Sequence, residues 1–191
     1  QSKLVSEDSA PLSKLVVDAI LKIVEKDGDK HSVDLDNLKV EKKAGGSIDD
    51  TSLINGIVLD KEIVHSGMPT KAEEAKIALV NAALEVEKTE MSAEIRISDP
   101  TQMQQFLEEE NKMLKSMVDK IHDIGANVLI CQKGIDDISQ HYLSKHGIMA
   151  VRRVKESDMT KLAKATGGRI STNLDDISAS DLGSAEIVQQ K

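Results

Sequence analysis

A single long helix predicted between Asp99 and Gly125 constrains this chain more than any other feature of its sequence. Asp99 is a favourable N-cap, Pro100 suits the first helical position, and Gly125 supplies the stop. No glycine and no second proline interrupts the segment. Such a helix spans about 38 Å, whereas a compact chain of this size has a radius of gyration of only about 16 Å. We therefore expect part of the helix to project from the folded body and to contact another molecule.

The apolar residues of this helix keep helical spacing in both of its halves. Successive members lie three, four or seven residues apart and are Met103, Leu107, Leu114, Met117, Ile121 and Ile124. The stripe is continuous from Leu114, so we expect this half to pack on the core. We expect Met103, Phe106 and Leu107 to lie on a projecting tip. The alternative, that the whole stripe is core or a coiled-coil seam, conflicts with the length of the helix.

The composition indicates a globular domain and argues against nucleic-acid binding and membrane insertion. Of the 191 residues, 39% are hydrophobic and 30% charged. A net charge of −8 opposes binding to a phosphate backbone, and Phe106 and Tyr142 alone cannot make a base-stacking surface. No run reaches the apolar length of a membrane span. Cys131 is the only cysteine, which rules out an internal disulfide and favours a reducing, cytoplasmic setting.

The rest of the chain reads as an amphipathic helix, a β-rich region, and an alternation of strands and helices. The first helix is predicted at 9–27. Strands or strand pieces are predicted at 38–43, 57–59, 63–64, 77–86, 94–97, 128–132, 148–154 and 169–172, and further helices at 136–145 and 157–165. Alternation after Gly125 indicates parallel strands joined by helical crossovers. The polar stretch from Asn173 reads as a linker.

Motifs for catalysis are missing, so the sequence favours recognition. The Gly45-Gly46 and Gly167-Gly168 pairs lack the Lys and Ser/Thr of a phosphate loop. Asp137 and His141 share a helix face, but their spacing to other residues suggests no further metal ligands. We therefore predict no catalytic, cofactor-binding or metal-binding residues.

Two surfaces are candidates for contact with a partner. The first is the helical tip with Met103, Phe106 and Leu107, joined by Met91 in the segment that leads into the helix, because such side chains offer soft, adaptable contact. The second combines the loop at 66–69, including Met68, with polar residues of the 136–145 helix that we expect to point away from Ile138 and Tyr142. These polar residues are Gln140, His141, Ser144 and Lys145. Simple solvent exposure explains them equally well.

Several long segments occur along the chain in a recognisable order. They are KKAGGSIDDT at 42–51, GIVLDKEIVHSGMP at 56–69, AEIRISDPTQMQQFLEEE at 93–110, GANVLICQKGIDD at 125–137, GIMAVRRV at 147–154, KLAKATGGRI at 161–170 and DLG at 181–183. In sequence and in order they resemble the apical domain of the group II chaperonins, the archaeal thermosome and its eukaryotic cytosolic relatives, and the resemblance extends over the chain from Val33 onward.

The resemblance implies a fold, a division into domains, and a role. The fold is α/β, a β-sandwich flanked by helices of the chaperonin apical-domain type, with a protruding long helix. Residues 1–34 would be a helical fragment of the intermediate domain, 35–176 the apical substrate-binding domain with its protrusion at about 88–112, and 177–191 a return segment. The helix that faces bound polypeptide would be 136–146, beside the loop at 65–69. Partners would be non-native client proteins and neighbouring subunits of a double ring.

One departure from the family is large. Its ATP site needs a Gly-Asp-Gly-Thr-Thr loop that this sequence lacks, so we expect an excised apical module without ATPase activity, with ATP and Mg²⁺ bound elsewhere in the parent ATPase. Two alternatives remain open. One is an α/β enzyme with a helical lid, whose candidate polar groups at strand ends (Gln132, Lys133, Arg153) lack a nucleophile–base pair. The other is a scaffold that pairs into a coiled coil through residues 103–121.

Overall fold

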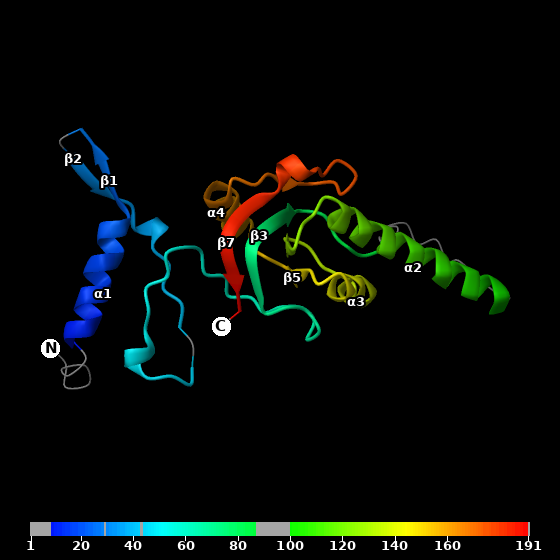
Figure 1. The fold of residues 1–191 in the computed structure, drawn as a ribbon, viewed down its shortest axis with the longest axis horizontal. Coiled ribbons are helices and arrows are strands. Elements are labelled where there is room, and N and C mark those ends of the chain that lie inside the picture. Colours follow the sequence, from blue (N-terminus) through cyan, green and yellow to red (C-terminus); the bar gives the residue numbers. More distant parts are fainter. Residues whose placement is uncertain (1–8, 29, 43, 87–99, 191) are drawn as a thin grey trace, which may run out of the picture. The chain divides into compact units, whose positions relative to one another are not determined.

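The computed structural model describes the backbone of residues 9–28, 30–42, 44–86 and 100–190. The chain divides into two compact units, residues 1–60 and 61–191 (Figure 1). Each unit is described by itself. The predicted strand at 94–97, the N-cap Asp99 and the candidate contact residue Met91 lie outside the described residues.

The first unit contains a helix, a β-hairpin and irregular chain. Helix α1 (Ser9–Lys22) precedes strands β1 (Val24–Asp27) and β2 (Lys30–Val33), which pair antiparallel. The predicted helix to residue 27 is therefore too long: Gly28, at φ 61°, makes a turn that lets the chain fold back and pair. Short 3₁₀ turns η1 (Leu35–Asn37) and η2 (Ile48–Asp50) follow. The strands predicted at 38–43 and 57–59 are wrong, because none of their described residues has a partner strand.

A five-stranded mixed sheet forms the centre of the second unit. It contains β3 (Lys71–Val80), β4 (Val128–Cys131), β5 (Met149–Val151), β6 (Ile170–Ser171) and β7 (Gly183–Gln189). The order β5-β4-β3-β6 is parallel throughout, as the alternation predicted, and β7 pairs antiparallel with β3. Reading the stretch from Asn173 as a linker was wrong for β7, whose mostly exposed side chains gave no apolar signal. The predicted strand piece at 63–64 is not a strand, although the Val64 N–H bonds the Ala150 carbonyl at 3.0 Å.

Three helices of this unit lie on the two faces of the sheet. They are α2 (Pro100–Asp123), α3 (Asp137–Lys145) and α4 (Glu156–Thr166). Ala78 and Val80 of β3 belong to a core cluster with Val118 and Ile121 of α2 and with Leu143 of α3. The alternate β3 residues are buried on the opposite face, and α4 contacts β3, β6 and β7. The predicted α/β class with a long helix is confirmed.

A close crossing of two backbones joins the end of α4 to the start of β7. A methyl group on Gly168 would lie 2.7 Å from the Gly183 nitrogen, and one on Gly183 would lie 2.2 Å from Thr166 Oγ1. The Arg169 N–H then bonds the Asp181 carbonyl at 2.9 Å, beside the 3₁₀ turn η3 (Ala179–Asp181). Both glycines are required here because no side chain fits between the two segments.

Candidate functional site

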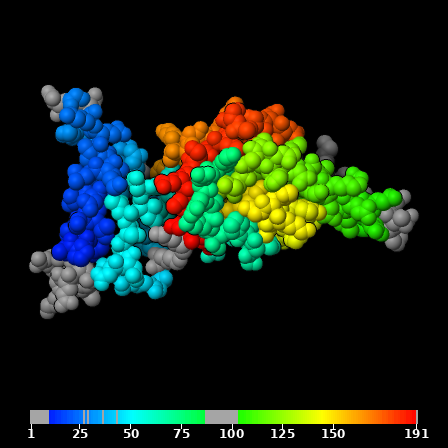
Figure 2. Space-filling view, viewed as in Figure 1, coloured from blue at the N-terminus to red at the C-terminus, as the bar shows by residue number. Residues whose placement is uncertain are grey.

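Helix α2 divides into an exposed half and a buried half, as its length predicts. Met103, Phe106 and Leu107 remain 47%, 42% and 51% exposed, whereas Leu114 is 2% and Ile121 0% exposed. In Figure 2 the first turns of α2 (green) form a ridge that extends past α3 (yellow). The three exposed side chains are spaced to share one side of the helix. The structure thus brings three of the predicted contact residues onto one solvent-facing ridge.

The buried half of α2 is held by α3 and by polar contacts at its last turns. Asp119 Oδ1 lies 3.3 Å from Nε2 of His146, the C-cap residue of α3. The rings of His122 and His146 lie with their centroids 4.3 Å apart. Lys120 forms an ion pair with Asp175 in the loop after β6. These contacts hold the base of α2 to its neighbours, so the exposed half extends from a rigid support.

A second surface forms where α3 meets the loop at 65–69. Asp136 caps α3 by accepting the Ile138 N–H at 2.8 Å. The rings of His65 and His141 lie 6.3 Å apart, and a methyl on Gly67 would lie 2.7 Å from Ser144 Oγ. The loop and α3 are therefore in contact, as the resemblance implied, with exposed His141 and half-buried Ser144 at the contact.

Two of the residues predicted for this second surface are buried. Met68 is 4% exposed and belongs to the core cluster. Gln140 is 4% exposed and donates to the Ile135 carbonyl at 2.8 Å. The prediction for Gln140 was wrong because it assumed that the side of the helix with Ile138 faces the core. The buried residues of α3 are instead Ser139, Gln140 and Leu143, and Ile138 is 39% exposed. The apolar pattern did not settle this phase, because Ile138 and Tyr142 share one side of the helix by their spacing of four residues, as Ser139 and Leu143 do.

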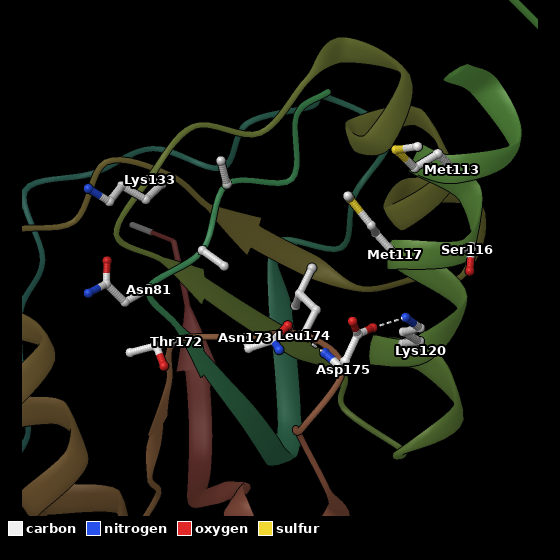
Figure 3. A pocket seen from close by; sticks show the side chains of 12 residues that line it. Asn81, Met113, Ser116, Met117, Lys120, Lys133, Thr172, Asn173, Leu174 and Asp175 are labelled. Atoms are coloured by element: carbon white, nitrogen blue, oxygen red, sulfur yellow. Dashed lines mark hydrogen bonds and ion pairs between the residues drawn. The ribbon is translucent and has the colours of Figure 1, made fainter. Parts of the chain in front are cut away.

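A cavity of about 700 Å³ lies between α2 and the carboxyl ends of the strands (Figure 3). Asn81 follows β3, Lys133 follows β4 and Thr172 follows β6. Met113 and Met117 line it from α2, with Leu174 below them. Sequence reasoning named Lys133 as a strand-end residue but did not predict a cavity, because the α2 residues that complete it come from a different part of the chain.

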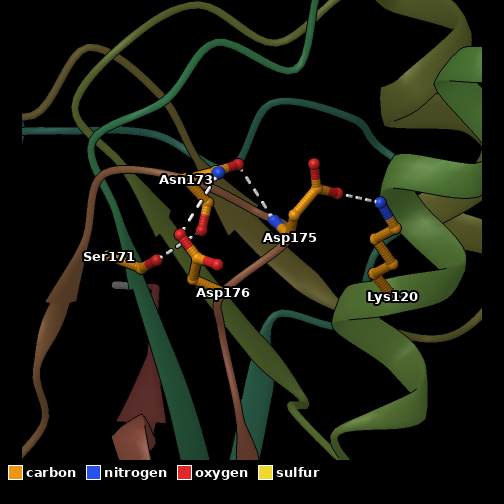
Figure 4. Close-up of polar contacts among 5 residues, drawn as sticks. All are labelled: Lys120, Ser171, Asn173, Asp175 and Asp176. Carbon is orange, nitrogen blue, oxygen red and sulfur yellow. Dashed lines mark hydrogen bonds and ion pairs between the residues drawn. The ribbon is translucent and has the colours of Figure 1, made fainter.

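The loop after β6 is held by its own hydrogen bonds (Figure 4). Ser171 Oγ donates to the Asn173 carbonyl at 2.6 Å, and Asn173 Oδ1 accepts the Asp175 N–H at 3.0 Å. Asn173 Nδ2 donates to Asp176 Oδ2 at 3.3 Å. With Asp175 also bound to Lys120, this wall of the cavity is preformed.

The one cysteine of the sequence lies in the core. Burial raises the pKa of the Cys131 thiol to about 11, so the thiol stays protonated and unreactive at neutral pH. Within the described ranges, no three His, Cys, Asp or Glu side chains converge to hold a metal ion. Among the same residues, no helix has the length and apolar character needed to span a bilayer.

Comparison with known proteins defines the class of this fold. The open-state monomer of a group II chaperonin from Methanococcoides burtonii superposes on the whole chain with a TM-score of 0.74 and 42% sequence identity, and 42% of that structure is matched. The mixed α/β fold with its long helix is thus the fold of a group II chaperonin domain.

Sequence relatives agree with the structural match. The family model described as TCP-1/cpn60 chaperonin family matches residues 1–191, and the chain belongs to this family. The thermosome subunit beta of Thermococcus kodakarensis is 59% identical over 189 residues. That of Saccharolobus solfataricus is 58% identical over 190 residues. The chain spans 35% and 34% of the length of these two relatives.

Proposed function

We propose that this chain is the polypeptide-binding and lid module of an ATP-dependent group II chaperonin. The observation that carries the proposal is the exposure of Met103, Phe106 and Leu107, at 47%, 42% and 51%, on a helix whose stripe is buried or half-buried from Leu114 onward. Large apolar side chains grouped on a supported ridge are a signature of protein contact. Membership of the chaperonin family makes non-native protein the expected partner.

The energetics of this ridge suit weak, repeated capture. Full burial of a Met, Phe or Leu side chain contributes about 1.5–3 kcal/mol, and association costs several kcal/mol before any affinity remains. One ridge would therefore bind a client weakly. Several ridges around a ring would bind it tightly through multivalency, and withdrawing them from the client together would release it.

The contact between α3 and the loop at 65–69 is the second part of the proposed client surface. This surface differs in chemistry from the ridge. It combines the exposed polar side chain of His141, the half-buried hydroxyl of Ser144 and the exposed apolar side chain of Ile138. Met68 and Gln140 support it from beneath. Met91, outside the described residues, stays a proposed contact next to the ridge. A mixed surface of this kind adds hydrogen bonds to the apolar contact of α2.

The remaining features of the mechanism belong to the longer protein. We place ATP and Mg²⁺ in the parts of the parent outside this chain, and expect no ATPase activity from the chain itself. Neighbouring subunits of a double ring would bring the ridges together as a lid, and ATP-driven domain movement would withdraw their apolar area from the client. The cytoplasm is the expected location, consistent with the free thiol of Cys131.

Light scattering of an aggregating client tests this function. A protein unfolded in guanidinium is diluted into buffer with the chain, with a Met103→Ser/Phe106→Ser variant, or with a Gln104→Ser/Gln105→Ser control from the same exposed turns. The chain and the control should suppress aggregation equally, and the apolar variant should lose at least about half of the effect. Equal suppression by all three proteins would show that the ridge does not bind clients.

A further inference from the structure

The direction of winding of the sheet reverses between β3 and β6. From β3 the chain runs through α2 to β4 and through α3 to β5, and both helices pack on one face. It then returns through α4, which contacts β3 and β6 on the other face, and enters β6 on the far side of β3. In open parallel sheets, ligands bind outside the carboxyl ends of the strands at such a reversal.

The cavity lies at this reversal. Its floor consists of residues that directly follow β3 and β6: Asn81 to Ala83, and Thr172 to Asp175. Its volume of about 700 Å³ is within the range of ligand pockets, and it is open to solvent, since Met113, Lys120 and Lys133 in its lining are exposed. The cavity is distinct from both surfaces assigned to the proposed function, because Met113 and Lys120 line it while the ridge lies nearer the start of α2.

The two walls of the cavity differ in chemistry (Figure 3). On the α2 side, Met113 and Met117 point inward above Leu174. On the strand side, the lining includes the amide of Asn81 and the ammonium group of Lys133, whose side chains point away from the methionines. Methionine adapts to apolar groups of different shape, so the first wall suits an apolar side chain of unspecified type.

The polar wall contains an unsatisfied acceptor. Asn81 Oδ1 is buried and is the one such side-chain atom without a hydrogen-bond partner among the described residues. Leaving a buried polar atom unpaired costs about 1–3 kcal/mol. Because this atom is closed off from solvent, a bound molecule does not reach it unless the Asn81 amide turns.

The charge of the cavity favours an acidic partner. Of its two lysines, Lys120 is paired with Asp175, the one acidic residue of the lining. In the part of the chain that the structure describes, no ion pair involves Lys133. The lining therefore has a net positive charge at Lys133, on the opposite side from the methionines.

We propose that this cavity binds an extended segment of a non-native polypeptide, with an apolar side chain between the methionines and an adjacent acidic side chain on Lys133. The inference rests on the proposed function for the nature of the partner, but adds a site with its own sequence preference. A ridge that binds any apolar residue would then act together with a cavity that selects Leu-Asp and similar pairs.

A charge swap tests the cavity directly. Fluorescence anisotropy measures binding of a short labelled peptide containing a Leu-Asp pair, and of its Leu-Lys counterpart, to the whole chain. Lys133→Glu should weaken the Leu-Asp peptide about five- to tenfold and strengthen the Leu-Lys peptide. Lys164→Glu on α4 makes the same change of net charge on the other face and should leave both affinities unchanged. Met113→Ser should weaken both peptides.

The ridge variant separates this proposal from the proposed function. Met103→Ser/Phe106→Ser should keep the affinity for the Leu-Asp peptide while losing suppression of aggregation. Equal effects of Lys133→Glu and Lys164→Glu, or no difference between the two peptides, would overturn the cavity site and leave the ridge proposal standing. Circular dichroism checks that each variant is folded, which is expected because Lys133, Met113 and Lys164 are all exposed.

Discussion

The two halves of α2 contain the same stripe of apolar residues in opposite environments. Leu107 and Leu114 lie two helical turns apart on one stripe, yet they are 51% and 2% exposed. The second half has α3 and the sheet beneath it, whereas the first half has extended past α3. Periodicity thus predicts which side of a helix is apolar, and helix length relative to the body predicts where that side is buried.

The largest effect should come from the same substitution made in each half. Leu114→Ala should lower the free energy of unfolding by about 2–5 kcal/mol, because it opens a cavity in the core. Leu107→Ala should change it by no more than about 0.5 kcal/mol. Urea denaturation measures both. Similar losses of unfolding free energy for the two variants would mean that the first half of α2 is packed in solution, and would contradict the difference between the two halves.

Thiol reactivity compares the buried core with the exposed half of α2 within one molecule. With a pKa of about 11, Cys131 is a thiolate in only about one molecule in a thousand near pH 8. A Gln105→Cys variant adds an exposed thiol on the first half of α2. Ellman's reagent should react with the new thiol at least about a hundredfold faster than with Cys131. Unfolding in urea should remove the difference, and equal rates in the folded protein would contradict the burial of Cys131.

The crossing at the end of α4 tests how tightly the base is packed. Gly168→Ala places a methyl 2.7 Å from the Gly183 nitrogen, so the backbone must shift, and we expect a loss of about 1–3 kcal/mol. Gly56→Ala is the control, because its nearest neighbour lies 4.0 Å away. Thermal unfolding followed by circular dichroism compares them. An unchanged Gly168→Ala protein would mean that the base tolerates more movement than its contacts indicate.

The smallest expected effect is electrostatic. The Ser178 hydroxyl and N–H donate to Asp181 and lower its pKa from 3.8. A lowered pKa stabilises the fold above the unfolded value, and this contribution is lost as the pH falls through the folded value. Ser178→Ala should therefore reduce thermal stability at neutral pH, and the difference from wild type should vanish well below pH 3.8. A difference that stays constant, or one shared by Ser184→Ala, would contradict this role.

Sequence reasoning predicted the elements with strong local signals. Proline at the first position and glycine after the end set the long helix, and β4 and β5 are apolar on both faces, as buried parallel strands are. The exposed first half of α2 was predicted by comparing the length of the helix with the size of a compact chain, and this comparison needs no knowledge of packing. The resemblance to the chaperonin family predicted that α3 lies beside the loop at 65–69.

The features that escaped prediction depend on contacts between distant residues. The hairpin at Gly28 and the strand β7 contain few apolar residues, so their pairing is invisible until the partner strand is known. The burial of Gln140 depends on the carbonyl of Ile135 that receives its amide. The cavity needs α2 to pass over the ends of β3 and β6, and no local pattern indicates that crossing.

The pairing of β3 with β7 has a mechanical consequence. Lys71 lies opposite Gln189, and the Gln190 N–H bonds the Thr70 carbonyl at 2.9 Å, so the chain enters and leaves the sheet at adjacent points. Tension that pulls these two strands apart would load their cross-strand bonds one after another, beginning with the bond between Gln190 and Thr70, and would act directly on the central strand. A rotation of these two strands would consequently rotate the sheet together with the base of α2 that packs on it. A small rotation at Thr70 would then become a large displacement of Met103, because Met103 lies on the exposed half of α2.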